Sequence, residues 1–80
     1  MRTTLNKLEL DYSATIESIE TDQSTKERLE SLGFLPGVLV FAVARTPLGS
    51  SMVYRCLNSM IALREEVTSK IEINLLENRE

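Results

Sequence analysis

The sequence predicts a small, mainly β protein: a strongly bent antiparallel barrel of about five strands with one short helix in its N-terminal third. Three observations lead to this fold class. Short β-branched or alternating apolar runs recur along the chain and are separated by polar turns. A single window, beginning near Ser24, combines helical spacing with start and stop signals. Eighty residues with 42% hydrophobic content suffice for one core and leave no room for a second.

The N-terminal part of the chain is expected to begin the sheet. Residues 1–11 suit either a short turn or a lead-in strand. Residues 13–19 alternate apolar and polar side chains and are rich in β-branched residues, which predicts the first clear strand.

The predicted helix covers residues 24–32. Ser24 and Glu27 have the spacing of a capping box, in which each side chain bonds a backbone N–H at the start of a helix. Gly33 is placed to end the helix, because glycine accepts a left-handed backbone. Pro36 and Gly37 then predict a tight type II turn.

The second half of the chain is expected to supply the remaining strands. A loop is predicted at residues 46–51, and Asn58–Ser59 are expected to form a two-residue turn. Residues 65–70 are too polar for more than one helical turn. The predicted strands are residues 38–45, 52–57, 60–64 and 71–75.

Short strands with a single early helix and no βαβ spacing fit an SH3-like barrel best. The domain is expected to span residues 1–80, with its folded core at about 5–75 and a frayed tail at 76–80. The expected core residues are Ile16, Leu29, Leu32, Val40 or Phe41, Leu63 and Ile73.

The charge balance argues against nucleic acid as a partner. Nine basic residues against twelve acidic ones give a net charge of −3, and no window gathers Lys and Arg into a basic patch. The chain has no run near 20 apolar residues, so no membrane insertion is expected. The lone cysteine, Cys56, cannot form an internal disulfide, and we therefore expect a cytoplasmic protein.

The side chains available for catalysis and metal ligation predict that the protein is not an enzyme and has no cofactor and no metal site. The sequence has no histidine, which is the commonest acid-base group and transition-metal ligand. Cys56 has no imidazole to deprotonate it and is interpreted as a core or sheet residue. The acidic residues near the first strand lack the spacing of a calcium loop and are interpreted as a solvated edge. They are Glu9, Asp11, Glu17, Glu20 and Asp22.

Three segments together resemble the FeoA family, the small ferrous iron transport protein A. Residues 29–37 read Leu-Glu-Ser-Leu-Gly-Phe-Leu-Pro-Gly, which joins a helix end to a Pro-Gly turn. Residues 44–49, Ala-Arg-Thr-Pro-Leu-Gly, look like the family's small-Pro-Leu-Gly hairpin loop. Residues 61–64 followed by 71–73 look like its closing strand pair. The resemblance covers roughly residues 5–75.

The chain departs from the family pattern at three places. Ser50–Ser51 replace an Asp-Pro pair, Asn58 stands where a turn glycine is usual, and Val67–Thr68 replace an acid-Ala pair. Loss of the proline is expected to loosen the hairpin loop, which puts in doubt any partner contact made at that tip.

The resemblance implies a non-enzymatic accessory protein of ferrous iron uptake. Its implied partner is FeoB, a membrane transporter with a cytoplasmic GTP-binding domain, which would recruit the protein to the inner face of the membrane. Read without the family, the chain is a rigid scaffold that presents binding loops. The candidate partner-binding residues are Leu35, Arg45, Leu48 and Tyr54. Leu48 is the strongest, because an apolar residue flanked by Pro, Gly and Ser has little local core to enter.

Other functions stay open at this point. The chain could be a generic SH3-like interaction module, a GTPase accessory that supplies Arg45 or Arg64 in trans, or a weak direct metal binder. Weak homo-oligomerisation, with any metal site formed between subunits, is also left open, as is the way in which FeoB would be regulated.

Overall fold

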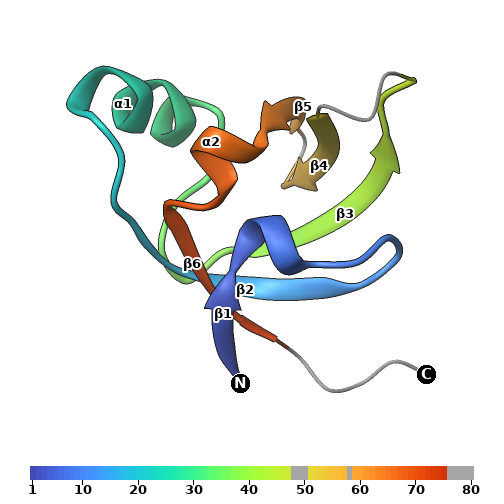
Figure 1. Cartoon of the computed structure of the whole chain (residues 1–80). Helices are drawn as coiled ribbons and strands as arrows, with labels where there is room; N and C mark the ends of the chain where they lie inside the picture. Colours follow the sequence, from blue (N-terminus) through green and yellow to red (C-terminus); the bar gives the residue numbers. More distant parts are fainter. Residues whose placement is uncertain (48–50, 58, 76–80) are drawn as a thin grey trace.

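The computed structural model describes residues 1–47, 51–57 and 59–75. Within these ranges the strands form one antiparallel sheet in the order β1-β6-β2-β3-β4-β5 (Figure 1). The strands are β1 (Arg2–Thr4), β2 (Ser13–Ile19), β3 (Leu39–Arg45), β4 (Ser51–Cys56), β5 (Ser59–Arg64) and β6 (Ile71–Leu75). The helical segments are η1 (Leu5–Lys7), α1 (Gln23–Ser31) and α2 (Glu65–Thr68).

The sheet bends strongly, so that β4 and β5 lie across the interior from β1, β2 and β6 (Figure 1). Two register shifts accompany this bend. One lies between Ile16 and Ser18 where β2 pairs with β6, and the other lies between Ala42 and Ala44 where β3 pairs with β4. An extra residue in one strand increases the local twist, which helps a short sheet to curl around its core.

The predicted mainly β class with one early helix is confirmed, and the strand count is six rather than about five. The added strand is β1, whose residues pair with Glu72–Asn74 of β6. Residues 1–11 contain both alternatives that the sequence offered, since β1 is followed directly by the turn of η1. β1 carries no apolar alternation because it is only three residues long and all three are polar, so no local pattern marks it as a strand.

Helix α1 lies close to the predicted window, but the predicted capping box is wrong. The N-cap residue is Asp22, whose Oδ2 accepts a hydrogen bond from the Thr25 backbone N–H at 3.0 Å. That hydrogen bond is the main reason why the pKa of Asp22 is lowered. Leu32 forms the C-cap, and Gly33 follows with a φ of +96°, as a helix-ending glycine requires.

The two predicted tight turns differ in outcome. Gly37 has a φ of +92° and the Val38 N–H donates to the Leu35 carbonyl at 3.1 Å, which confirms the Pro-Gly turn. The β4–β5 turn is one residue earlier than expected, because Cys56 pairs with Ser59. Leu57 therefore occupies the turn with a φ of +56°, and Asn58 lies outside the described residues.

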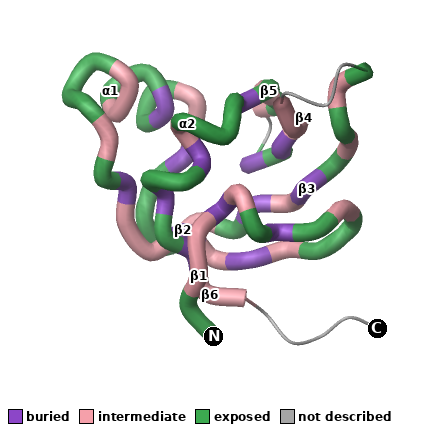
Figure 2. The backbone as a smooth tube through the Cα atoms, viewed as in Figure 1, coloured by how far each residue is buried: buried purple, intermediate pink, exposed green. Residues whose placement is uncertain are grey.

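The core is one cluster enclosed by the bent sheet and the helices (Figure 2). Of the expected core residues, Leu32 and Phe41 are only partly buried, so Val40 rather than Phe41 faces the interior. Ile16, Leu29, Val40, Leu63 and Ile73 are buried as predicted. The larger cluster also contains Leu5, Leu8, Ala14, Ile19, Phe34, Ala42, Tyr54, Cys56 and Ile71.

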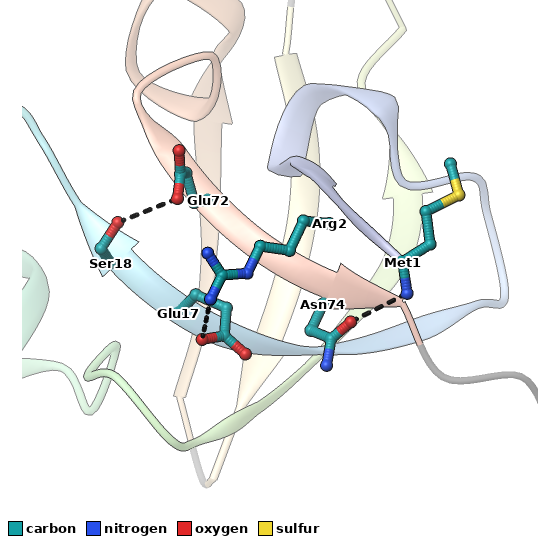
Figure 3. Close-up of polar contacts among 6 residues, drawn as sticks. All are labelled: Met1, Arg2, Glu17, Ser18, Glu72 and Asn74. Carbon is teal, nitrogen blue, oxygen red and sulfur yellow. Dashed lines mark hydrogen bonds and ion pairs between the residues drawn. The ribbon is translucent and has the colours of Figure 1, made fainter.

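Polar contacts tie the N-terminal strand to the outer side of the sheet (Figure 3). The Arg2 guanidinium Nη2 lies 3.4 Å from Glu17 Oε1, and the Met1 amino group donates to Asn74 Oδ1 at 2.9 Å. Both pairs are exposed to solvent, so each contributes at most about 1 kcal/mol to stability. Glu17, one of the acidic residues expected at a solvated edge, thus has a basic partner.

Candidate functional site

A small pocket opens at the end of the barrel where β3 passes into β4. Its volume is about 110 Å³, and η1 and α2 complete its wall. Met52 and Leu63 form the apolar part of the lining. The polar part consists of Asn6, Arg45, Ser51, Tyr54, Glu65 and Thr68. A volume equal to a few water molecules suits one side-chain end or a small ion, not a drug-sized ligand.

Tyr54 contributes to the pocket from inside the core. Its side chain is only 1% exposed, and its hydroxyl donates to the Leu5 carbonyl oxygen at 3.4 Å. Burial raises the pKa of Tyr54 to about 12, although the Thr68 side chain and the positive charge of Arg45 act in the opposite direction. Tyr54 is one of the candidate partner-binding residues that the sequence suggests. The structure instead makes it a core residue whose contact with any partner would be confined to the pocket.

Arg45 is the exposed cation beside the pocket. It is the last residue of β3 and pairs with Met52 of β4. The Thr46 N–H donates to the Ser51 carbonyl oxygen at 3.2 Å, which closes the base of the hairpin directly after Arg45. Among the residues that the structure describes, the Arg45 side chain has no ion pair. Its guanidinium is therefore available for an external carboxylate or phosphate.

Glu65 supplies a negative charge to the same pocket. Its Oε2 accepts a hydrogen bond from Asn6 Nδ2 at 3.3 Å, which connects α2 to η1. The Thr68 hydroxyl donates to the Glu65 backbone carbonyl at 3.5 Å. The sequence analysis missed Asn6, Glu65 and Thr68 as site residues. They lie in segments about 60 residues apart, and no local motif joins them.

The structure does not gather the four predicted partner-binding residues into one site. Arg45 and Tyr54 lie together at the pocket. Leu35 is 38% exposed in the turn before β3, whereas Arg45 is the last residue of that strand, so the length of β3 lies between them. Leu48 lies outside the described residues. The four residues therefore belong to at least two regions of the surface.

Cys56 has the structural role that was predicted for it. The residue is fully buried, and its Sγ lies 3.3 Å from the Gly33 carbonyl oxygen and 3.5 Å from that of Leu39. Burial raises the pKa of the Cys56 thiol, which disfavours the thiolate that nucleophiles and metal ligands require. Within the described residues, no three His, Cys, Asp or Glu side chains are close enough together to hold a metal ion.

No helix in the described ranges is long and apolar enough to cross a membrane.

Comparisons with solved structures give the same fold. The FeoA protein of Chlorobium tepidum has a TM-score of 0.88 and 22% identity, with 98% of this chain and 74% of that chain covered. Iron(II) transport protein A of Clostridium thermocellum has a TM-score of 0.84 and 30% identity, and 92% of this chain matches 46% of that longer chain. The Stenotrophomonas maltophilia FeoA, a prokaryotic SH3 domain protein solved with zinc, has a TM-score of 0.78 and 29% identity over 90% of this chain and 89% of that one.

No curated protein matches the chain significantly by sequence. The family model described as the FeoA domain matches residues 3–75, which is nearly the whole described length. The SH3-like architecture agrees with that match. So do the sequence segments around Gly33, Pro36 and Arg45, which follow one another in the order seen in the family. The chain therefore belongs to the FeoA family, whose members serve as small accessory domains in ferrous iron transport.

Proposed function

We propose that this protein binds and regulates a FeoB-type membrane transporter of ferrous iron through the barrel end that contains Arg45. The observation that supports this most directly is the exposed Arg45, which has no ion pair in the described part of the chain and borders a polar pocket. In the sequence, Arg45 is followed closely by Pro47, whose backbone is restricted, and by the apolar residue Leu48. A charge beside an apolar residue is a common composition for a protein contact.

Leu48 and Arg45 have unequal expected contributions to this contact. An apolar side chain that enters a partner's pocket is fully desolvated and can dominate the binding free energy. An exposed charge at the rim usually contributes less than about 1 kcal/mol. Truncation of Leu48 should therefore weaken the interaction more than neutralisation of Arg45 does.

The test measures FeoB-dependent uptake of radioactive ferrous iron in cells whose own FeoA has been deleted. Leu48→Ala should abolish the support given by the wild-type protein, and Arg45→Gln should reduce it partially. Glu77→Ala is the control and should behave like wild type. Each variant is checked by thermal melting, which Leu48→Ala should leave nearly unchanged.

Two results would contradict the proposal. If Leu48→Ala folds and supports normal uptake, the functional surface lies elsewhere, and Leu35 is the next residue to truncate. If Leu48→Ala unfolds the protein, Leu48 belongs to the core and not to a contact surface.

A second candidate function is stimulation of the transporter's GTPase by an arginine supplied in trans. The exposed guanidinium of Arg45, which forms no ion pair with any residue that the structure describes, supports it, since such a group stabilises charge on a transferring phosphoryl group. In this case Arg45→Lys should lose the stimulation while binding persists, because lysine lacks the bidentate donor geometry. GTP turnover by the transporter's cytoplasmic domain, measured with each variant, distinguishes this role from binding alone.

A further inference from the structure

A group of exposed apolar residues lies on the outer side of β3, β4 and the turn into β5, at the opposite end of β3 from Arg45. Leu39 is 40% exposed, Leu57 is 68% exposed and Met60 is 61% exposed. Leu39 and Leu57 each lie one residue beyond the paired residues Val40 and Cys56, and Met60 pairs with Arg55. We name Leu39, Phe41, Arg55, Leu57 and Met60 the outer patch.

Leu57, one residue of the outer patch, has an unusual backbone conformation and lies beside Gly33. Leu57 has a φ of +56°, and its Cδ1 would lie 3.1 Å from a Cβ atom placed on Gly33. Leucine rarely adopts this conformation, because its Cβ then crowds the backbone. The glycine at position 33 thus leaves room for Leu57 to lie beside the end of α1.

Arg55 provides a positive charge within these apolar residues. Its guanidinium carbon lies 5.0 Å from the centre of the Phe41 ring, in the geometry of a cation–π contact. Among the described residues, the Arg55 side chain has no hydrogen bond or ion pair. The guanidinium lies beside the ring and Arg55 is exposed, so the outer patch presents a positive charge to solvent.

The dimensions of the outer patch match one face of a short helix. Neighbouring strands lie about 4.8 Å apart, so the distance from β3 to β5 is about 10 Å, and Leu39 and Phe41 are about 7 Å apart along the strand. Side chains at positions i, i+3, i+4 and i+7 of an α-helix extend over about 10 Å. Two turns of an amphipathic helix would cover the outer patch, and a carboxylate beside its apolar stripe would reach Arg55.

Charge disfavours the two other occupants that such a surface could have. Attraction to an anionic membrane usually needs four to eight clustered Lys and Arg residues, whereas the outer patch has Arg55 alone and the chain carries a net charge of −3. A second copy placed face to face would bring two Arg55 cations near each other. A partner segment that carries a carboxylate needs no cluster of basic residues and does not bring two Arg55 cations together.

We propose that the outer patch binds an amphipathic helical segment of a partner protein, with apolar side chains against Leu39, Leu57 and Met60 and a carboxylate paired with Arg55. This surface is distinct from the Arg45 end of the barrel. The proposal therefore does not depend on the transporter contact proposed above.

The test uses two synthetic 14-residue helical peptides with the same leucine stripe, one with a glutamate beside the stripe and the other with a lysine. Binding is followed through backbone amide chemical shifts of the labelled full-length protein. The glutamate peptide should shift amides around residues 39–41 and 55–60 and bind about three- to fivefold more tightly than the lysine peptide, as expected for a partly exposed ion pair. Arg55→Glu should reverse the preference, and Arg55→Gln should remove it.

Lys7→Glu is the matched control, because it makes the same change of charge on η1, far from the outer patch. It should keep the preference of the wild-type protein, and Met60→Ser should weaken binding of both peptides. Equal affinity for the two peptides, or shifts confined to other surfaces, would overturn the proposal. It would also be overturned by a dimer that Met60→Ser dissociates in sedimentation, or by binding to phosphatidylglycerol vesicles that Arg55→Glu abolishes.

Discussion

Tyr54 combines a buried aromatic ring with a hydroxyl at the pocket. Met52, Tyr54 and Cys56 alternate with their neighbours along one strand, and the sequence favours a core or sheet position for Cys56. Because side chains at i and i+2 share a face, Tyr54 could have been assigned to the core by the same argument. The sequence offers Tyr54 as a partner-binding candidate because its strand adjoins the hairpin loop, and a tyrosine ring is commonly buried when its hydroxyl finds a partner.

The raised pKa of Tyr54 predicts a loss of stability at high pH. In the unfolded chain the phenol ionises near pH 10, whereas in the folded protein its pKa is about 12. Between these values the folded state keeps a proton that the unfolded state has lost, so the free energy of unfolding falls as pH rises. Below pH 10 the contribution is fully present, and it falls by at most about 1.4 kcal/mol per pH unit above that.

Urea unfolding between pH 8 and pH 12 checks this prediction. Wild type should lose more stability than Tyr54→Phe above pH 10, because the variant has no phenol to ionise at that position. The buried Cys56 thiol also has a raised pKa and is present in both proteins, so the difference between the curves isolates Tyr54. Parallel curves for the two proteins would show that the phenol is not protected from ionisation by the fold.

At the scale of the elements, α1 depends on its first and last turns more than on its apolar content. Leu29 is its one buried residue, and the helix is only nine residues long. Isolated helices of this length are marginal in water, so the caps and the single core contact must hold it in place. Asp22 at the start and Gly33 after the end supply the two terminal signals.

Replacement of the N-cap should therefore destabilise the protein more than replacement of the predicted cap. Asp22→Ala removes the acceptor for the Thr25 N–H and should lower the urea midpoint, whereas Ser24→Ala should leave it nearly unchanged. The lowered pKa of Asp22 adds a pH dependence. Its carboxylate stabilises the fold above its ordinary pKa of 3.8, and this contribution is lost as the pH falls through the lower pKa of the folded state.

The difference in urea midpoint between wild type and Asp22→Ala should accordingly become smaller at acidic pH. Equal midpoints for Asp22→Ala and wild type at neutral pH would contradict the assignment of the cap. If Ser24→Ala lowered the urea midpoint more than Asp22→Ala does, the capping box suggested by the sequence would be correct after all.

The elements that could be predicted are those whose signals lie within a few residues. β2, β3, β5, β6 and the one-turn α2 agree with the sequence because alternation, β-branching or polarity marks each of them. The exact β4–β5 turn required the cross-strand register, which no local pattern encodes. The pocket depends on contacts between η1 and α2 and could be recognised only after the chain had folded.

At the scale of the whole molecule, the barrel is a scaffold with two separate exposed surfaces. The Arg45 end combines an exposed cation with a polar pocket, and the outer patch combines the Arg55 cation with apolar side chains. Their separation along β3 would let two segments of one partner, or two partners, bind at once.

The composition of the whole chain also bears on how the protein takes part in iron transport. A direct role in carrying iron would need a site with several nitrogen, sulfur or oxygen ligands in one place. The chain has no histidine, and its one thiol is buried with a raised pKa. A related FeoA was solved with zinc, so metal binding by this protein requires its own measurement.

We expect the purified monomer to bind ferrous iron no more tightly than about millimolar, because scattered carboxylates form only weak, solvated sites. Anaerobic titration followed by calorimetry measures this directly, and Cys56→Ser is the control that should not change the result. A stoichiometric micromolar site would contradict the expectation. If that site appeared only at concentrations where the protein self-associates, carboxylates from neighbouring subunits would be its source, and the transport role would then include metal held between copies.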